Sequence, residues 1–317
     1  MTGRPWGKQQ VGLQPDGKAR LSQVVTTYGP GAMVDLLDHA VLIGGLEFWN
    51  YDKQRGVPIL VEPRLRDAVA DHLRQFEREV ALDDAFREPP AGDDKQPSRF
   101  AGVAVLEFPQ WFVCQNADCR ALMKSSQLEL KGGRYVHACT RTKLTECVPV
   151  RFVSACPAGH LDEFPWPWFA HRDRPRCAAP SLRLLEGATG DFSEVVVRCA
   201  CGAWAPLSAA QVKDANPTCS GRRPWLGPDA DEECEERQRL LVRTASNAYF
   251  SQVMSALSVP EHGRELEHTV REHWAFLKKA TAATLPAAKE LSDDVRVALA
   301  PYPDAAVLRV IEALRDE

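Results

Sequence analysis

The chain has 317 residues, 44% of them hydrophobic and 26% charged, with a net charge of −4 and a pI of about 6.1. This is the composition of an ordinary globular protein, and the length allows two compact domains or one domain with a sizeable insertion. The mild negative charge excludes a chain that is basic throughout, so any contact with nucleic acid must come from a local patch.

Nothing in the sequence predicts insertion into a membrane or export. No stretch reaches the ~20 apolar residues that a membrane-spanning helix needs. The first ten residues, MTGRPWGKQQ, lack the apolar core of a secretory signal. We therefore expect a cytoplasmic protein.

The first third of the chain predicts strands, turns and one helix. Residues 20–62 contain short apolar runs broken by glycine and proline, which is typical of short strands joined by tight turns. Residues 63–84 begin with a proline and carry apolar side chains at helical intervals, so they predict a helix that starts at Pro63. Residues 86–98 contain three prolines and little apolar material, and we expect an exposed linker or loop there.

The middle of the chain predicts short strands followed by a helix. Residues 102–108 and 194–199 are rich in valine, which favours strands. Residues 234–257 place apolar and small side chains from Leu241 to Ala256 on one stripe, which predicts a helix.

The end of the chain, residues 260–317, predicts two or three further helices, separated at Pro286 and at Pro301 and Pro303. Together the elements predict an α+β fold in which zinc-ribbon-like small β elements are embedded between an N-terminal mixed region and C-terminal helices. The expected division is 1–99 for the mixed α/β region, 100–234 for a cysteine-rich zinc-binding region and 235–317 for the helical region.

The cysteines are the most informative residues. All ten lie between Cys114 and Cys234. Thiols that serve only as small core residues would be scattered, and disulfides are rare in a reducing compartment. Clustered cysteines therefore predict metal sites, with Zn²⁺ as the ion.

Spacing suggests how these ligands divide among two or three zinc ions. Two cysteine pairs separated by 19 residues resemble a zinc ribbon, and this first site takes Cys114, Cys119, Cys139 and Cys147. A second all-cysteine site takes Cys199, Cys201, Cys219 and Cys234. A third takes Cys156, His160, His171 and Cys177. Alternatively, Cys156 and Cys177 exchange places with members of the second set.

The same residues raise the alternative of catalysis. A zinc-dependent hydrolase or nuclease could be centred on His160 and Asp162, with a neighbouring acid, Asp162 or Glu163, as the general base. The sequence does not match the deaminase pattern, it contains no Cys-x-x-Cys, and it has no G-x4-G-K-[ST] phosphate loop. We expect no enzymatic activity, because metal-bound thiolates are poor nucleophiles.

A local excess of arginine gives candidates for contact with DNA. Residues 141–183 hold seven basic and four acidic residues. The candidates for phosphate contact are Arg172, Arg174, Arg176, Arg222 and Arg223. The neighbouring block FPWPWF, residues 164–169, could stack on bases, but its two prolines favour an extended backbone whose rings pack into a core or a partner.

Several blocks together resemble one family. They are SQVVTTYGPGAMVDLLDHAVLIGGLEFW (22–49), RFVSACPAGHLDEFPW (151–166), CACGA (199–203), CSGRRPWLG (219–227) and RTASNAYFSQV (243–253). This set is similar to the amino-terminal half of the DrmB family, which belongs to the DISARM phage-defence systems of bacteria. The resemblance spans roughly residues 20–257, and the chain is about half as long as the family leads us to expect.

The resemblance implies an antiviral role within a protein complex. It implies a non-catalytic subunit that pairs with DrmA, a large helicase-like ATPase, in a complex that restricts phage by acting on incoming DNA. The ATP chemistry would then belong to the partner, which agrees with the missing phosphate loop here.

Overall fold

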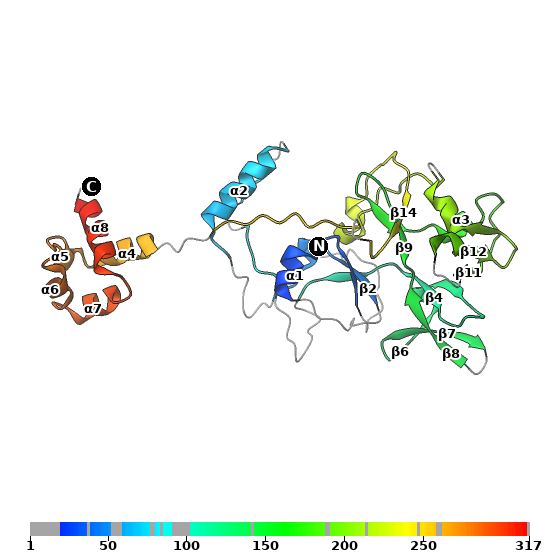
Figure 1. The fold of residues 1–317 in the computed structure, drawn as a ribbon, viewed down its shortest axis with the longest axis horizontal. Coiled ribbons are helices and arrows are strands. Elements are labelled where there is room, and N and C mark those ends of the chain that lie inside the picture. Colours follow the sequence, from blue (N-terminus) through cyan, green and yellow to red (C-terminus); the bar gives the residue numbers. More distant parts are fainter. Residues whose placement is uncertain are drawn as a thin grey trace. The chain divides into compact units, whose positions relative to one another are not determined.

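The structure is a computed structural model (Figure 1) that describes residues 20–36, 39–51, 59–76, 80–82, 85–90, 102–140, 143–187, 191–212, 215–245, 248–257 and 262–315. The chain forms two compact units. One, here called the sheet unit, comprises residues 1–61 and 83–253, and the other, the helical unit, comprises residues 62–82 and 254–317. All ten cysteines belong to the sheet unit, and the predicted three-part division stays a prediction.

The strands of the sheet unit are short. They are β1 (Met33–Asp35), β2 (Ala40–Ile43), β3 (Val105–Glu107), β4 (Trp111–Cys114), β5 (Ala121–Lys124), β6 (Glu129–Lys131), β7 (Arg134–Thr140), β8 (Lys143–Pro149), β9 (Phe152–Ala155), β10 (Leu161–Glu163), β11 (Leu182–Leu185), β12 (Val196–Cys199), β13 (Trp204–Pro206) and β14 (Arg239–Val242). The valine-rich stretches therefore form β3 and β12, as predicted.

The sheet unit also holds two short α-helices and several single turns of 3₁₀-helix. These are α1 (Leu21–Thr26), α3 (Trp166–Ala170), η1 (Leu46–Phe48), η2 (Ser125–Gln127), η3 (Phe192–Glu194), η4 (Leu207–Gln211), η5 (Pro224–Leu226) and η6 (Pro228–Ala230). Within residues 20–62, α1 is a helix where only strands and turns were expected. Of the expected linker 86–98, residues 91–98 lie outside the described residues.

An eight-stranded antiparallel sheet with the order β13-β12-β11-β5-β4-β8-β7-β6 dominates the unit. Strand β4 is buried along its whole length because both faces of the sheet are covered there. Trp111 and Val113 point into one core with α3, whereas Phe112 and Cys114 point into a second core on the opposite face. Successive side chains of a strand alternate between faces, so four consecutive buried residues indicate a central strand.

The aromatic block at residues 164–169 lies mainly inside the first core. Phe164, Trp166 and Phe169 are fully buried, which confirms packing as their role, whereas Trp168 is 41% exposed. The expected extended backbone is wrong, because residues 166–170 form helix α3 with Pro167 in its first turn. Proline is tolerated at that position, since the first amide groups of a helix have no partner within the helix.

Two three-stranded antiparallel sheets complete the unit, with the orders β1-β2-β3 and β10-β9-β14. They share one small core, in which Leu42 of the first sheet meets Val153 and Leu161 of the second. This packing supports the hairpin of β9 and β10, whose turn carries Cys156 and His160.

The helix predicted over residues 234–257 is wrong. Strand β14 occupies residues 239–242 and pairs antiparallel with β9, with Leu241 opposite Val153. No helix occurs in the described parts of this segment, 234–245 and 248–257. The apolar stripe was real, but pairing with a strand some distance away in the sequence overrides a helical periodicity of this strength.

The helical unit contains α2 (Pro63–Arg74), α4 (His262–Glu272), α5 (Trp274–Leu277), α6 (Leu285–Lys289), α7 (Asp293–Leu299) and α8 (Asp304–Arg315). Helix α2 begins at Pro63, as predicted. Residues 262–315 form five helices rather than two or three, with Pro286 in the first turn of α6 and both Pro301 and Pro303 between α7 and α8. The α+β class with C-terminal helices is thus confirmed.

Helices α4 to α8 of the helical unit share one apolar core, whereas α2 has no buried residue. Their buried residues include Leu277, Leu285, Leu299 and Ile311, each fully inaccessible. Within the described residues, none of the helices is both long enough and apolar enough to cross a lipid bilayer.

Candidate metal centres

Three groups of side chains in the sheet unit can each hold a metal ion. Each group consists of three cysteines and one histidine, and in each group the four ligand atoms lie within 4.8 Å of one another. The groups, called centres 1, 2 and 3, are Cys114, Cys119, His137 and Cys139; Cys156, His160, Cys219 and Cys234; and His171, Cys177, Cys199 and Cys201. Ligands arranged tetrahedrally around one zinc ion at about 2.0–2.3 Å are roughly 3.3–3.8 Å apart, so the spacing suits that geometry.

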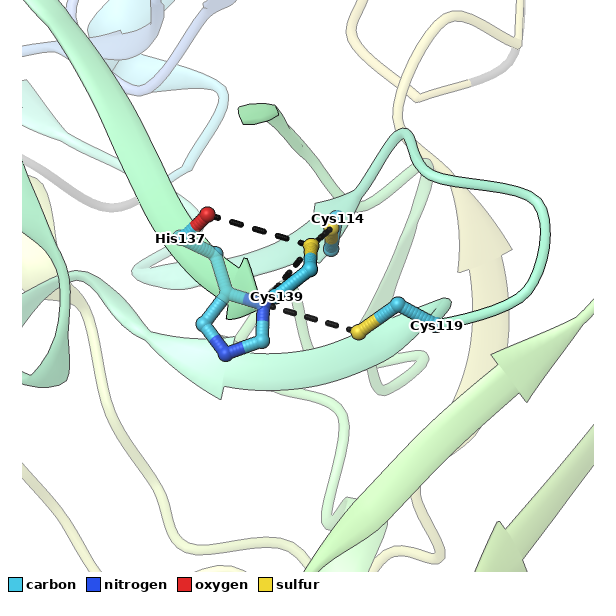
Figure 2. A group of neighbouring side chains, drawn as sticks. All are labelled: Cys114, Cys119, His137 and Cys139. Atoms are coloured by element: carbon cyan, nitrogen blue, oxygen red, sulfur yellow. Dashed lines mark hydrogen bonds between the residues drawn. The ribbon is translucent and has the colours of Figure 1, made fainter. Parts of the chain in front are cut away.

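Centre 1 lies between the end of β4, the turn that follows β4, and strand β7 (Figure 2). Cys114 ends β4, Cys119 lies in the turn before β5, and His137 and Cys139 come from β7. The Sγ atoms of Cys114 and Cys139 are 3.1 Å apart, and Nδ1 of His137 lies 3.5 Å from the Sγ atoms of both Cys119 and Cys139. His137 and Cys139 are two residues apart on one strand, so their side chains share a face.

Centre 2 joins the β9–β10 turn to two later loops. Nδ1 of His160 lies 3.3 Å from Sγ of Cys156, which is 4.0 Å from Sγ of Cys234. The other ring nitrogen of His160, Nε2, lies 2.7 Å from a carboxylate oxygen of Glu232. A metal-ligating histidine usually donates its second N–H to such a carboxylate, which fixes the ring and strengthens the ligand.

The carboxylate of Glu232 is itself held by Arg223, whose guanidinium donates to it at 2.7 Å. Hydrogen bonds from Arg223 and His160 lower the pKa of Glu232 to about 2. The carboxylate therefore stays charged near neutral pH and can accept a hydrogen bond from Nε2 of His160, while Nδ1 faces the thiol of Cys156.

Centre 3 links the end of α3 to the β12–β13 turn. Nε2 of His171 lies 3.3 Å from Sγ of Cys201, and the Sγ atoms of Cys177 and Cys199 are 3.7 Å apart. Nδ1 of His171 lies 2.7 Å from the carbonyl oxygen of Pro167 and can donate to it. The ring nitrogen of His171 that faces away from the thiols therefore has a hydrogen-bond partner, as in His160, with a backbone carbonyl in place of a carboxylate.

Two ligand turns have the same backbone design. The amide of Gly159 donates to the carbonyl of Cys156, and the amide of Gly202 donates to the carbonyl of Cys199. Both glycines have a positive φ, 83° and 92°, which side chains rarely allow. Each turn brings the chain back toward its first cysteine. His160 therefore lies beside Cys156, and Cys201 lies beside Cys199, as candidate ligands.

The electrostatics of the centres favour a bound cation. Although burial opposes ionisation, hydrogen bonds from neighbouring groups lower the pKa of Cys139 to about 6 and that of Cys199 to about 7, and they also lower the pKa of Cys156. Each centre thus has one thiol with a lowered pKa and one whose pKa is raised, above all by burial: Cys114, Cys219 and Cys177. A positive ion would relieve the remaining repulsion, since thiolates are the metal-binding form.

The three centres divide the ligands differently from the first sequence-based grouping. Cys156 groups with Cys219 and Cys234, and Cys177 groups with Cys199 and Cys201, so each lies with two members of the expected second set. His160 and His171, expected in one site, belong to different centres. The reason is topological. Strand β14 pairs with β9, and the segment that leads into β14 carries Cys219 and Cys234, so these two cysteines lie near the β9–β10 turn.

In centre 1, His137 occupies the place expected for Cys147, and spacing arguments based on cysteines alone missed it. Cys147 lies opposite Cys114 in the β4–β8 pair and is 6% exposed. Burial raises its pKa to about 11, so it remains a protonated thiol within the second core. The signal for His137 was the alternation His-x-Cys on a strand. All ten cysteines are free thiols, without disulfides.

Three of the five arginines proposed for DNA contact are engaged with the protein. Arg222 pairs with Asp162 at 3.1 Å, Arg223 pairs with Glu232, and Arg172 donates to the carbonyl of Ala209 and lies over the ring of Phe169. Arg174 and Arg176 are exposed and make no ion pair with a described residue. They lie between two ligands of centre 3, His171 and Cys177.

Asp162, the expected general base, is held by several partners. Its carboxylate accepts from the Ser220 hydroxyl at 2.6 Å and from Arg222 at 3.1 Å. The neighbouring Glu163 accepts the Gln110 amide at 2.6 Å, and burial raises its pKa to about 7. Asp162 thus stabilises the loop that carries Cys219.

Comparison with known proteins places this arrangement in a family. The DISARM protein DrmB of Bacillus paralicheniformis is 31% identical to this chain over 190 residues, which confirms the resemblance noted in the sequence. The match covers 57% of this chain and 32% of that protein, so the chain spans about a third of the length of this curated relative. A family model described as "Domain of unknown function (DUF8724)" matches residues 20–250, a range that includes every ligand of the three centres. The chain therefore belongs to the family defined by this domain of unknown function, DUF8724.

Proposed function

We propose that this chain is a zinc-binding scaffold subunit of a phage-defence complex that acts on DNA. The observation that carries the proposal is the set of three Cys₃His centres, two of which have a second hydrogen-bond partner on the ligating histidine. Similarity to a DISARM protein supports the defence role.

Zinc suits the three centres better than other common ions. Thiolate and imidazole ligands in tetrahedral sets of four select Zn²⁺, whereas magnesium and calcium prefer oxygen. Structural zinc stabilises folding by about 10–16 kcal/mol in small zinc peptides, which is as large as the stability of a whole domain. Three such ions would compensate for the short strands and divided cores of the sheet unit.

Four protein ligands in each centre favour a structural role over a catalytic one. A catalytic zinc keeps one coordination position open for water, whereas a structural zinc is closed. The alternative function, a zinc-dependent hydrolase or nuclease at His160 and Asp162, would require one ligand to leave centre 2 and Asp162 to release Ser220 and Arg222. Loss of DNA cleavage on Asp162→Asn would favour this alternative.

The partner follows from the family resemblance. A DrmA-like helicase would supply the ATP-dependent step, since the sequence contains no phosphate loop. Within the complex, Arg174 and Arg176 are the remaining candidates for phosphate contact, and their loop is anchored at both ends by centre 3.

The metal content of the purified chain tests the first part of the proposal. Mass spectrometry of the metals should find about three zinc ions per chain, one for each centre. A content near zero in protein purified without chelator would contradict the proposal. A content of two zinc ions per chain would mean that one centre is a cluster of thiols and an imidazole that binds no ion.

Co-purification with the helicase partner tests the second part. The wild-type chain should pair with a DrmA-like protein and increase its affinity for DNA. Arg174→Glu together with Arg176→Glu should weaken DNA binding and reduce its salt dependence while pairing is retained. Unchanged DNA affinity would show that Arg174 and Arg176 do not contact DNA.

A further inference from the structure

A row of side chains crosses three neighbouring strands of the large sheet at one level. Arg183 of β11 lies directly opposite Arg198 of β12, and Arg198 lies directly opposite Trp204 of β13. Directly opposed residues in an antiparallel pair have Cβ atoms about 4.5–5.5 Å apart. Two guanidinium groups and an indole are therefore held side by side by the backbone of the sheet.

These three side chains point away from the core. Their neighbours along the strands, such as Leu182 and Val197, lie in the core that α3 covers, and strand side chains alternate between faces. Arg183 and Arg198 are exposed, and the side chain of Trp204 is 54% exposed. The row therefore faces solvent on the side of the sheet opposite α3.

The arrangement is unfavourable for the protein by itself. Like charges directly opposite each other in a sheet are destabilising. Neither Arg183 nor Arg198 makes an ion pair with a described residue, so no such pair among these residues offsets the repulsion. A Trp side chain exposed to this extent also forgoes much of the burial that normally stabilises it. Each of these costs would be offset by an anionic ligand that carries a flat aromatic group.

Centre 3 fixes part of this surface. Cys199 and Cys201 lie in the turn between β12 and β13, so Arg198 immediately precedes the first of these ligands and Trp204 follows the turn. The amide of Cys199 donates to the carbonyl of Ala203 at 2.7 Å and closes the turn. The positions of Arg198 and Trp204 are thus set by a rigid element rather than by a loop.

We propose that Arg183, Arg198 and Trp204 form a binding site for single-stranded nucleic acid. The two arginines contact the phosphodiester backbone, and an unpaired base stacks on the indole of Trp204. This inference deepens the proposed contact with DNA and rests on it, but it assigns the contact to a different set of residues from Arg174 and Arg176. In a duplex the base faces are covered by their neighbours, so Trp204 favours a single strand.

The chemistry of the row distinguishes a nucleic acid from an acidic peptide. An acidic peptide would satisfy the two arginines but would leave the exposed indole without a stacking partner. A single strand alternates phosphates with flat bases, which matches two cations beside one aromatic ring. Both single-stranded DNA and single-stranded RNA have this pattern, and direct binding measurements separate them.

Fluorescence anisotropy of a labelled oligonucleotide tests the stacking contact with the full chain. The probes are oligothymidylate and oligouridylate of about 20 nucleotides and a duplex of the same length. We expect tighter binding of a single strand than of the duplex. Trp204→Ala should raise the Kd about tenfold, Trp204→Phe should retain most of the affinity, and Trp168→Ala, which removes another exposed indole, should have no effect.

The arginine contacts have a separate signature in the salt dependence. Replacing both Arg183 and Arg198 by Gln should reduce the slope of log Kd against log salt by about 1.4, which corresponds to two phosphates on a single strand. Arg183→Glu alone should weaken binding yet maintain or raise the melting temperature, because it converts a repulsive pair into an attractive one. A purely structural arginine would lower the melting temperature instead.

The outcomes separate this inference from the proposed function. If the wild-type chain binds no single strand, or if the Arg183, Arg198 and Trp204 variants bind as tightly as wild type, the inference is wrong. The zinc content and the effect of Arg174 and Arg176 would still decide the proposed function. If the variants keep nucleic-acid binding but lose the helicase partner, the row is a protein interface and the inference is again wrong.

Discussion

In the helical unit, ten buried apolar residues from α4 to α8 form one core, and the segment that contributes them has no cysteine. The described part of the sheet unit divides its buried apolar residues among three cores, one of eighteen residues and two of five and four, and three clusters of thiols and imidazoles lie beside them. Most of its strands have only three or four residues. The helical unit is therefore stabilised mainly by apolar burial, whereas in the sheet unit the proposed metal ligation would act beside the apolar cores to hold short strands in place.

Removal of metal should therefore affect the two units very differently. A strong zinc chelator should unfold the sheet unit, because each structural zinc contributes on the order of 10–16 kcal/mol to folding. Buried Trp111 and Trp166 should then become exposed and their fluorescence should shift to longer wavelength. The helices of residues 262–315, which belong to the helical unit, should survive. Far-UV circular dichroism and a protease-resistant C-terminal fragment would measure this.

Adding excess zinc after chelation is the control, and it should restore the tryptophan signal. If chelator leaves fluorescence and protease resistance of the sheet unit unchanged, apolar burial is sufficient there and the contrast between the units is lost.

The reverse experiment weakens the helical unit alone. Leu299 of α7 is fully buried, so Leu299→Ala should lower the free energy of unfolding of this unit by about 2–5 kcal/mol through lost burial and a residual cavity. Leu291→Ala is the matched control, because Leu291 is 69% exposed and should cost little. Urea denaturation followed by helical circular dichroism gives the two values.

The zinc content of the Leu299→Ala variant should equal that of wild type. A variant that also loses zinc would mean that the sheet unit needs the helical unit to fold.

A buried acid distinguishes the sheet unit further. Glu163 accepts the Gln110 amide, but its other oxygen, Oε2, is buried without a partner among the described residues. Burial, with repulsion from Asp162, raises its pKa from 4.5 to about 7. The folded state therefore binds more protons than the unfolded state between these values, so stability falls as pH rises from about 5 to about 7 and is lowest above that range.

Glu163→Gln should remove this pH dependence. The variant should be more stable than wild type at pH 8 by up to about 3 kcal/mol, and the difference should shrink toward pH 6. Chemical denaturation at several pH values measures it, with Glu129→Gln as an exposed control on β6. A variant that is less stable than wild type at pH 8 would show that the ionised carboxylate has a stabilising partner.

The sequence was a good guide wherever the signal is local. Pro63 marks the start of α2, the valines mark β3 and β12, and the confinement of cysteines to one region marks the three centres. Signals that depend on distant pairing were not available. The stripe at residues 234–257 has a helical spacing of apolar side chains. Its pairing with β9, which lies more than 80 residues earlier, cannot be recognised from that local spacing.

The same limit applies to the ligand sets. Cys156 and Cys234 belong to one centre although 77 residues separate them, and spacing along the chain does not predict such pairs. His137 was missed because a strand residue two positions from a cysteine has no turn signature, whereas His160 and Cys201 are each next to a turn glycine, Gly159 and Gly202.

The smallest expected effect tests this assignment in centre 1. Cys147→Ala should leave the zinc content unchanged and lower the free energy of unfolding by about 1 kcal/mol, because a buried thiol that only packs behaves as a small apolar side chain. His137→Ala should instead remove the fourth ligand of the centre and reduce the zinc content by about one ion per chain. Metal analysis and urea denaturation of the two variants give both numbers. If Cys147→Ala loses the ion and His137→Ala retains it, the all-cysteine grouping expected from the zinc-ribbon spacing is correct, and β7 contributes only one ligand.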